Sequence, residues 1–101
     1  MKAQDLRIGN YVNEAIAGPI KITLSILMHI EGSENYKPIP LTEDILLDLR
    51  KKLKSFFDYN LINDENNYFL FFNGFRIYIK YLHQLQNLYF ALTSNELEFN
   101  Y

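Results

Sequence analysis

The strongest local signal in this chain is the dipeptide Asn73-Gly74, which lies between two runs rich in aromatic and β-branched residues. Both residues tolerate positive φ, so they favour a type I′ turn between two antiparallel strands. We therefore predict a β-hairpin over residues 68–72 and 75–81. Its two-residue turn fixes the register, in which one face carries the core pairs Phe72–Phe75, Leu70–Ile77 and Tyr68–Ile79.

The opposite face of the predicted hairpin mixes aromatic rings with cations, in the pairs Phe71–Arg76, Phe69–Tyr78 and Asn67–Lys80. Such rings are most often packed beneath another element, here the N-terminal strands or a second subunit. The alternative is a platform on which a flat ring stacks next to a positive charge. The candidate ligand-binding residues of this platform are Phe69, Arg76, Tyr78 and Lys80.

Length and composition limit the fold further. The chain has 101 residues, of which 49% are hydrophobic and 22% charged, so we predict one globular domain over residues 1–101. Fourteen of its sixteen Phe and Tyr residues follow Thr42. The N-terminal part is thus aliphatic and β-rich, and the C-terminal part is aromatic and mixes helix with strand.

Several function classes are disfavoured by composition. The chain has no cysteine, so disulfides, thiol catalysis and cysteine-based zinc sites are excluded. Its net charge of −2 argues against broad binding of nucleic acids. No apolar run approaches the length of a membrane span, and residues 1–10 do not read as a signal peptide. The cytosol of the host cell is therefore the expected location.

Alternating apolar residues dominate the N-terminal part, at Ile20, Ile22, Leu24, Ile26, Met28 and Ile30. This period of two predicts a long or bent strand over residues 20–30, with Leu27 as the one exception. The pattern resembles the opening of a small SH3-like barrel.

Two stretches carry helical spacing. In the first, Thr42 is the expected N-cap, and an apolar stripe follows at Ile45, Leu46, Leu49, Leu53 and Phe56. In the second, residues 82–92 place leucines and Tyr89 on one side of a helix and His83, Gln86, Asn87 and Phe90 on the other. That second side is either packed internally or is a contact face for a partner protein, formed by Phe90, Asn87 and Gln86.

The second helix also carries a resemblance. Residues 81–93, which read YLHQLQNLYFALT, resemble a signature of small proteins of gut-bacterial phages and prophages. Residues 6–12 (LRIGNYV) resemble the opening of these proteins, and residues 38–43 (PIPLTE) their central segment. The resemblance implies a phage-associated origin and no known enzymatic activity. It supplies no catalytic residue.

Motifs for catalysis are missing from the sequence. It contains no phosphate-binding glycine loop and no nucleophile elbow, and its two histidines, His29 and His83, have no metal-ligand spacing. Asp64-Glu65 is interpreted as part of a turn rather than as a calcium site, since the spacing of a calcium-binding loop is absent. We therefore expect no enzyme, no metal and no cofactor.

Taken together, the patterns predict an α+β fold in which a small antiparallel sheet packs with two helices. The favoured function is non-catalytic binding by a phage accessory protein that sequesters a small nucleotide-like host defence signal. A second possible ligand site is the junction of Arg7, Asn10, Tyr36 and His83. The alternatives are an adaptor or inhibitor of a host protein and, least favoured, a small hydrolase. We also expect a homo-oligomer, because a small domain covers only one aromatic hairpin face efficiently.

Overall fold

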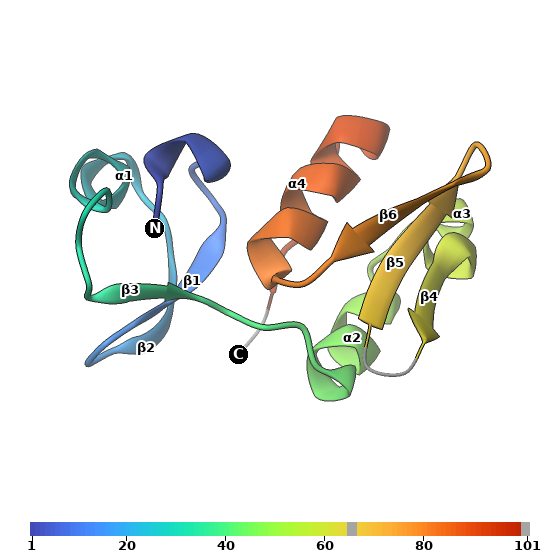
Figure 1. Cartoon of the computed structure of the whole chain (residues 1–101), viewed down its shortest axis with the longest axis horizontal. Helices are drawn as coiled ribbons and strands as arrows, with labels where there is room; N and C mark the ends of the chain where they lie inside the picture. The colour runs from blue at the N-terminus through green and yellow to red at the C-terminus, as the bar shows by residue number, and fades with distance from the viewer. Residues whose placement is uncertain (65–66, 100–101) are drawn as a thin grey trace.

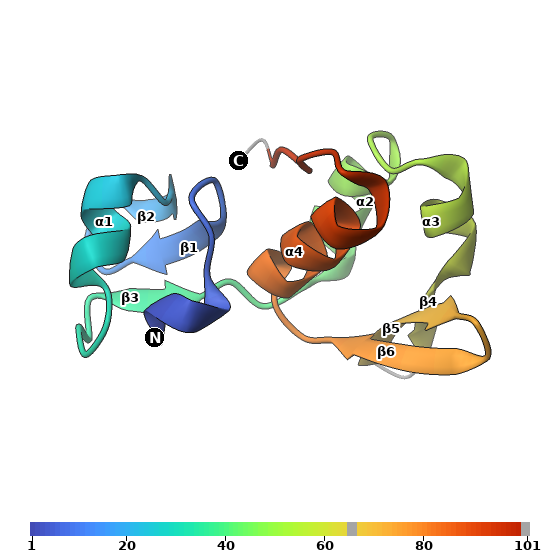
Figure 2. The same cartoon turned by 90° about the horizontal axis from the view of Figure 1, so that it is seen from above.

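The computed structural model describes residues 1–64 and 67–99, with the side chain of Phe56 excepted. Within these residues the chain forms two three-stranded antiparallel sheets, four α-helices and a short 3-10 helix, so the predicted α+β class is confirmed. The elements form two units side by side, with α4 between them (Figures 1 and 2). Prediction from sequence expected one sheet and two helices, fewer than the structure contains.

The N-terminal unit is built around one sheet with the strand order β2-β1-β3. Its elements are η1 (Ala3–Asp5), β1 (Tyr11–Glu14), β2 (Gly18–Lys21), α1 (Leu24–His29) and β3 (Tyr36–Pro38). Helix α1 lies at the outer end of this unit (Figure 2). The unit has a small core of its own, formed by Leu6, Val12, Ile22 and Ile30.

The predicted strand over residues 20–30 is wrong beyond Lys21, because Leu24–His29 form a helix. The Thr23 hydroxyl accepts a hydrogen bond from the Ile26 N–H at 3.3 Å, which caps the first turn. Ile26 and Leu27 then face the small core while Leu24 and Met28 are exposed, which is helical rather than alternating burial. The pattern that resembled an SH3-like opening is therefore a short strand followed by a helix.

The C-terminal unit contains a second sheet of order β4-β5-β6, with three helices behind one of its faces (Figures 1 and 2). Its elements are α2 (Glu43–Arg50), α3 (Ser55–Asn60), β4 (Leu61–Asp64), β5 (Asn67–Phe72), β6 (Phe75–Ile79) and α4 (Leu82–Thr93). The main core lies between this sheet and these helices. Its most completely buried side chains are Leu49, Phe57, Leu70, Leu82 and Leu85.

Helix α2 begins as predicted, with the Thr42 hydroxyl accepting from the Ile45 N–H at 3.3 Å. It ends at Arg50, earlier than the apolar stripe suggested, and α3 follows at Ser55. The Lys52 N–H bonds to the Leu49 carbonyl at 2.9 Å, which tightens the chain as the helix ends. Leu53 is nevertheless buried, because the turn between the two helices folds over the main core.

The predicted hairpin and its register are confirmed, although β6 ends at Ile79 rather than at Tyr81, and the predicted pair Asn67–Lys80 is not formed. Strands β5 and β6 pair Phe72 with Phe75 and continue in the expected register to Tyr68 and Ile79. Asn73 has φ of 50° and Gly74 has φ of 81°, the positive values that a type I′ turn requires.

The end of β6 is joined by the segment that connects the two units. The Leu41 N–H donates to the Lys80 carbonyl at 3.0 Å, and the Leu82 N–H donates to the Ile39 carbonyl at 2.8 Å. The connector therefore runs beside the short segment that joins β6 to α4. Helix α4 then spans Leu82–Thr93, one residue longer than predicted.

Candidate functional site

The outer face of the second sheet, which the three helices leave uncovered, carries most of the predicted platform. The ring of Phe69 lies at its centre and is only 5% exposed. Arg76 lies over this ring, 5.1 Å from its centroid, and Tyr78 packs against it at 5.5 Å. Phe69 is therefore occupied by neighbours of its own chain, and the expectation that it stacks a ligand is corrected.

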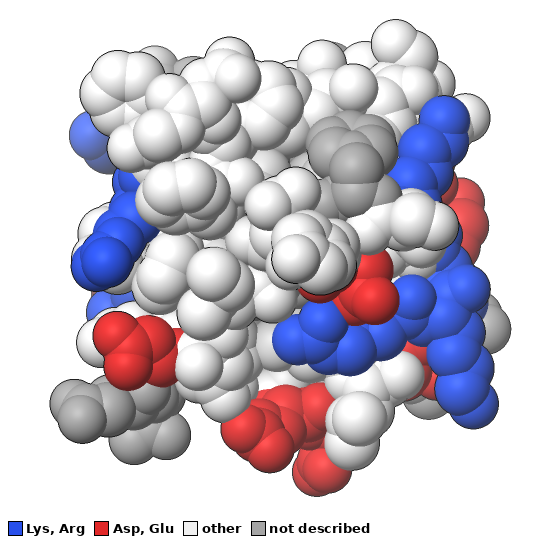
Figure 3. Space-filling model, turned by 90° about the vertical axis from the view of Figure 1, so that its right-hand side faces the viewer, with Lys and Arg blue, Asp and Glu red and all other residues white. Residues whose placement is uncertain are grey.

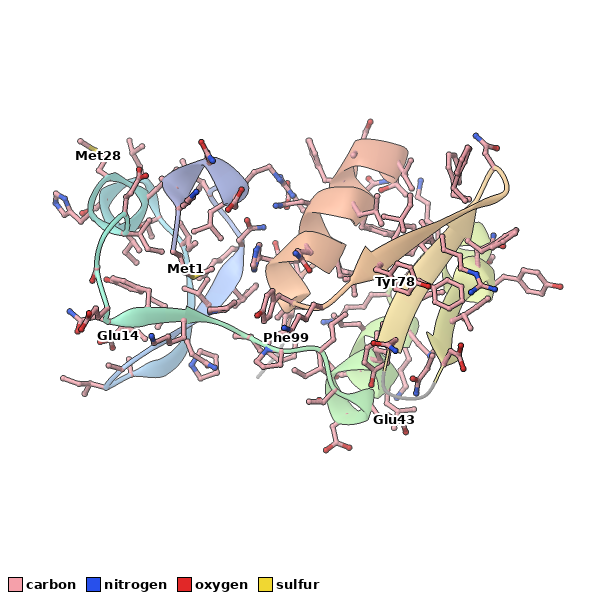
Figure 4. All side chains as sticks on the ribbon, viewed as in Figure 1. Met1, Glu14, Met28, Glu43, Tyr78 and Phe99 are labelled. Carbon is pink, nitrogen blue, oxygen red and sulfur yellow. The ribbon has the colours of Figure 1, made fainter. Side chains whose placement is uncertain are left out.

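Tyr78 remains available. Its side chain is 62% exposed and stands on the sheet face that points away from the helices (Figure 4). Lys80, two residues further along the chain, is exposed as well. Together they line a cavity of about 500 Å³ between the connector and the neighbouring ends of β5 and β6. Its lining includes Pro40, Leu41, Asn67, Tyr78, Lys80 and Gln84.

Gln84 shapes this cavity, which we call the Tyr78 cavity. Its side-chain oxygen accepts hydrogen bonds from the backbone N–H groups of Lys80 at 2.8 Å and Tyr81 at 3.0 Å. The oxygen is thereby fixed to the start of α4, and the amide NH₂ group is left to donate to a ligand. The ammonium of Lys80 lies 5.4 Å from the ring centroid of Tyr81. The cavity thus offers an aromatic ring, a cation and an amide donor, while Arg76 is not part of its lining.

The second predicted site, around Arg7 and Asn10, is a structural joint. Asn10 is fully buried, and its side-chain NH₂ donates to the Asn87 side-chain oxygen at 2.9 Å. The Nε of Arg7 donates to that same oxygen at 2.8 Å, and its terminal nitrogen pairs with Glu96 at 2.6 Å. These groups satisfy one another, so Arg7 and Asn10 hold the N-terminal unit against α4.

Gln86 is the most deeply engaged residue of this joint. It is fully buried, and its side-chain oxygen accepts from the Tyr11 N–H at 2.9 Å. Its NH₂ group donates to the carbonyls of Gly9 at 3.2 Å and Leu97 at 3.0 Å. Gln86 is thus inaccessible to a partner protein, which corrects its assignment to a contact face. Asn87 is also taken up by internal bonds.

Phe90 is partly exposed, so part of the proposed contact face lies at the surface. Its side chain is 40% exposed, and the guanidinium of Arg7 lies 4.4 Å from its ring centroid. One side of the ring is therefore occupied by a cation from the N-terminal unit. Phe90 extends the joint between the units rather than standing alone on the surface.

His83 lines a second, shallower cavity of about 650 Å³, where the N-terminus and η1 face the start of α4. The residue is 5% exposed, and its ring is parallel to that of Tyr81 at 5.8 Å. Its Nδ1 is buried without a hydrogen-bond partner among the described residues. Burial lowers the pKa of His83, and the nearby Asp5 opposes this shift.

Tyr36 lies apart from these groups. It is half-buried against the small core of the N-terminal unit and does not line the cavity of His83. The junction proposed from sequence therefore brings Arg7 and Asn10 together with Asn87 and Gln86, rather than with Tyr36.

Sequence reasoning missed the residues that turn the platform into a cavity, namely Pro40, Leu41 and Gln84. The spacing of Gln84 three residues after Tyr81 is a usable signal, because a glutamine at this helix position reaches back to the N-cap backbone. No comparable signal shows that the connector runs beside Lys80.

Within residues 1–64 and 67–99, no group of histidine and carboxylate side chains is arranged to hold a metal ion. The helices in this part of the chain are all too short or too polar to cross a membrane. Comparison with known protein families, with curated proteins and with solved structures found no match to this chain.

Proposed function

We propose that this chain is a non-catalytic binding protein that holds a small nucleotide-like molecule in the Tyr78 cavity. One observation carries the proposal. Tyr78 and Lys80, singled out from sequence as a ring and a cation for a ligand, line the same cavity of about 500 Å³. A pocket lined by a cation, tyrosine and amides suits a polar aromatic ligand, whereas a flat apolar patch suits a protein partner.

Each part of the cavity matches one part of a nucleotide. The exposed ring of Tyr78 offers a stacking surface for a base, worth roughly 1–3 kcal/mol. The ammonium of Lys80 offers a charge-assisted hydrogen bond to a phosphate, worth roughly 1.5–3 kcal/mol. The amides of Asn67 and Gln84 supply donors and acceptors for the base edge or the sugar.

The resemblance of three segments to small phage proteins supports a biological setting for this binding. We propose that the chain acts in the host cytosol and withholds a nucleotide signal of antiviral defence. Such a role requires capture and no chemistry. It agrees with a cavity built from Tyr78, Lys80 and amides, which are groups that bind rather than react.

Isothermal titration calorimetry with linear and cyclic mono- and dinucleotides of adenine and guanine tests the proposal. We expect Lys80→Gln and Tyr78→Leu each to weaken binding about tenfold or more. Lys37→Gln and Tyr59→Leu are matched controls, because both residues are exposed and neither lines the cavity. Binding should also be weaker at high salt, since it involves an exposed charge.

Three results would contradict the proposal. Absence of heat from every nucleotide would shift the assignment to a protein partner. Recovery of a chemically altered nucleotide after incubation would shift it to an enzyme. Equal loss of affinity in the Lys80 and Lys37 variants would move the site away from this cavity.

A further inference from the structure

Strand β6 has a free outer edge, and its hydrogen-bonding groups can be assigned from the hairpin register. Next to a two-residue turn, the pairs Phe72–Phe75 and Leu70–Ile77 exchange backbone hydrogen bonds. Arg76 and Tyr78 lie between these pairs, so their N–H and C=O groups point away from β5. Those groups find no backbone partner among the described residues.

The two edges of this sheet differ. On the β4 side, the Asn63 side chain is bonded to Glu43 of α2 at 2.6 Å, and Asp64 adds a further charge. Polar and charged side chains of this kind protect a strand edge from pairing. On the β6 side, Arg76 is the one charged residue of the strand, the apolar side chains of Phe75 and Ile77 flank it, and Phe75 is 72% exposed. In the end-on view of Figure 3, few Lys, Arg, Asp or Glu side chains lie in the upper part of the described surface.

The connector limits the length of this free edge. The carbonyl of Lys80 is already occupied by the Leu41 N–H, so the edge is closed from Lys80 onward. The hairpin turn at Asn73 and Gly74 closes it at the other end. Only the outward groups of Arg76 and Tyr78 remain, which is enough for a short antiparallel pairing and little else.

We propose that two copies of this chain pair their β6 strands antiparallel around a two-fold axis at Ile77. In this register Arg76 of one copy exchanges backbone hydrogen bonds with Tyr78 of the other, and the second pair is identical by symmetry. The two sheets then form one continuous sheet, and Ile77 meets its own copy across the axis.

Side-chain chemistry selects this register over the others. A pairing of Arg76 with its own copy sets like charges opposite one another, which is destabilising. A pairing of Tyr78 with its own copy sets Arg76 opposite Lys80. These charges are again alike, and the Lys80 carbonyl is already bonded to the Leu41 N–H. Pairing Arg76 with Tyr78 instead places a guanidinium beside a tyrosine ring on the outer face.

The pairing also completes the ligand site. It brings Arg76 of the partner subunit beside Tyr78, at the rim of a cavity whose only lining cation is Lys80 among the described residues. The second cation suits a ligand with more than one phosphate. This last step rests on the proposed nucleotide binding, whereas the dimer itself does not.

Light scattering without any nucleotide tests the dimer first. We expect a particle of twice 12.0 kDa for the natural chain. Arg76→Pro should return the particle to 12.0 kDa, because proline removes an outward N–H that the hairpin does not use. Arg76→Thr, which keeps this N–H, should remain a dimer. A natural chain of 12.0 kDa at every concentration from micromolar to millimolar would overturn the dimer.

Amide hydrogen exchange of the natural chain avoids any effect of proline on folding. We expect the amides of Arg76 and Tyr78 to be protected in concentrated solution and to exchange rapidly on dilution. The amides of Ile77 and Ile79 should be protected at both concentrations, since they are bonded to β5. Rapid exchange of Arg76 and Tyr78 at all concentrations would overturn the pairing.

Mixing two defective variants tests the contribution of the partner subunit. Arg76→Thr and Tyr78→Leu should each bind nucleotide about tenfold more weakly. In a mixed dimer, the intact Tyr78 of one copy meets the intact Arg76 of the other. An equal mixture should therefore recover about a quarter of the natural sites. No recovery, with the dimer intact, would overturn the shared site and leave the dimer standing.

Discussion

The two units differ in the size of their hydrophobic cores. Among the described residues, the N-terminal unit buries four apolar side chains in its own cluster, whereas the main core in the C-terminal unit has sixteen, one of which, Tyr11, comes from β1. Burial of apolar surface is the main stabilising contribution in a domain this small. The difference indicates that the C-terminal unit carries most of the stability, and that the N-terminal unit depends on what it is attached to.

Helix α4 supplies that attachment. Its leucines and Tyr89 pack into the main core, while Gln86 and Asn87 bind the backbone and side chains of residues 5–11. The same helix therefore packs against the apolar main core and also makes polar contacts with the N-terminal unit. We infer that the N-terminal unit opens more readily than the C-terminal unit, because its own core is small and polar bonds hold it to α4.

The largest effect is expected for Gln86→Leu. This change removes the hydrogen bonds that Gln86 makes with the Tyr11 N–H and with the carbonyls of Gly9 and Leu97. The bonds to Tyr11 and Leu97 are buried, whereas the bond to Gly9 is partly buried. Each buried bond that is lost costs roughly 1–3 kcal/mol, so the free energy of unfolding should fall by at least about 2 kcal/mol in urea denaturation. Gln84→Leu on the same helix is the control, with a loss of about 1 kcal/mol because only an exposed cap is removed. Equal losses would contradict the role of Gln86.

Substitution of one glycine in each unit imposes a similar backbone strain on both and so allows the stability of the two units to be compared. Gly74 and Gly32 have φ of 81° and 78°, and neither has an atom within 4 Å of an added Cβ. Valine at either position costs about 1–3 kcal/mol of backbone strain. We expect Gly74→Val to speed amide exchange throughout β5, and Gly32→Val to speed it in the N-terminal strands alone. Equal effects on β5 would mean that the two units unfold together.

The smallest effect concerns pH and His83. Because burial lowers its pKa in the folded chain, the unfolded chain binds its proton first as pH falls. The resulting stability is complete above about pH 6.5 and is lost as pH falls through the lowered value. Urea denaturation between about pH 7.5 and 5 should show a shallower pH slope for His83→Gln. His29→Gln, at an exposed position, should keep the slope of the natural chain.

Local chemistry predicted some elements well and others poorly. The hairpin was predictable because Asn73-Gly74 fixes a turn without help from distant residues. Residues 20–30 were mispredicted because alternation outweighed two helix signals, the Thr23 cap and the apolar Leu27. The early end of α2 at Arg50 was also not predicted, because Leu53 fits the apolar stripe of a longer helix and is buried even though the helix ends before it.

The candidate site was predictable only in part. Tyr78 and Lys80 follow from the hairpin register, but the cavity exists because Pro40 and Leu41 run beside the end of β6. That contact joins residues about forty positions apart, and no local pattern encodes it. Burial of Phe69 by Arg76 and of Gln86 by the N-terminal unit likewise depends on packing rather than on spacing.

Amide hydrogen exchange with and without a nucleotide that gives heat in calorimetry tests the binding proposal most directly. We expect new protection around Asn67, Tyr68 and residues 78–84, with no change in β1, β2 or α1. This result would place the site in the C-terminal unit, which has the larger core. Protection confined to residues 1–38, or to the cavity of His83, would contradict the assignment to the Tyr78 cavity.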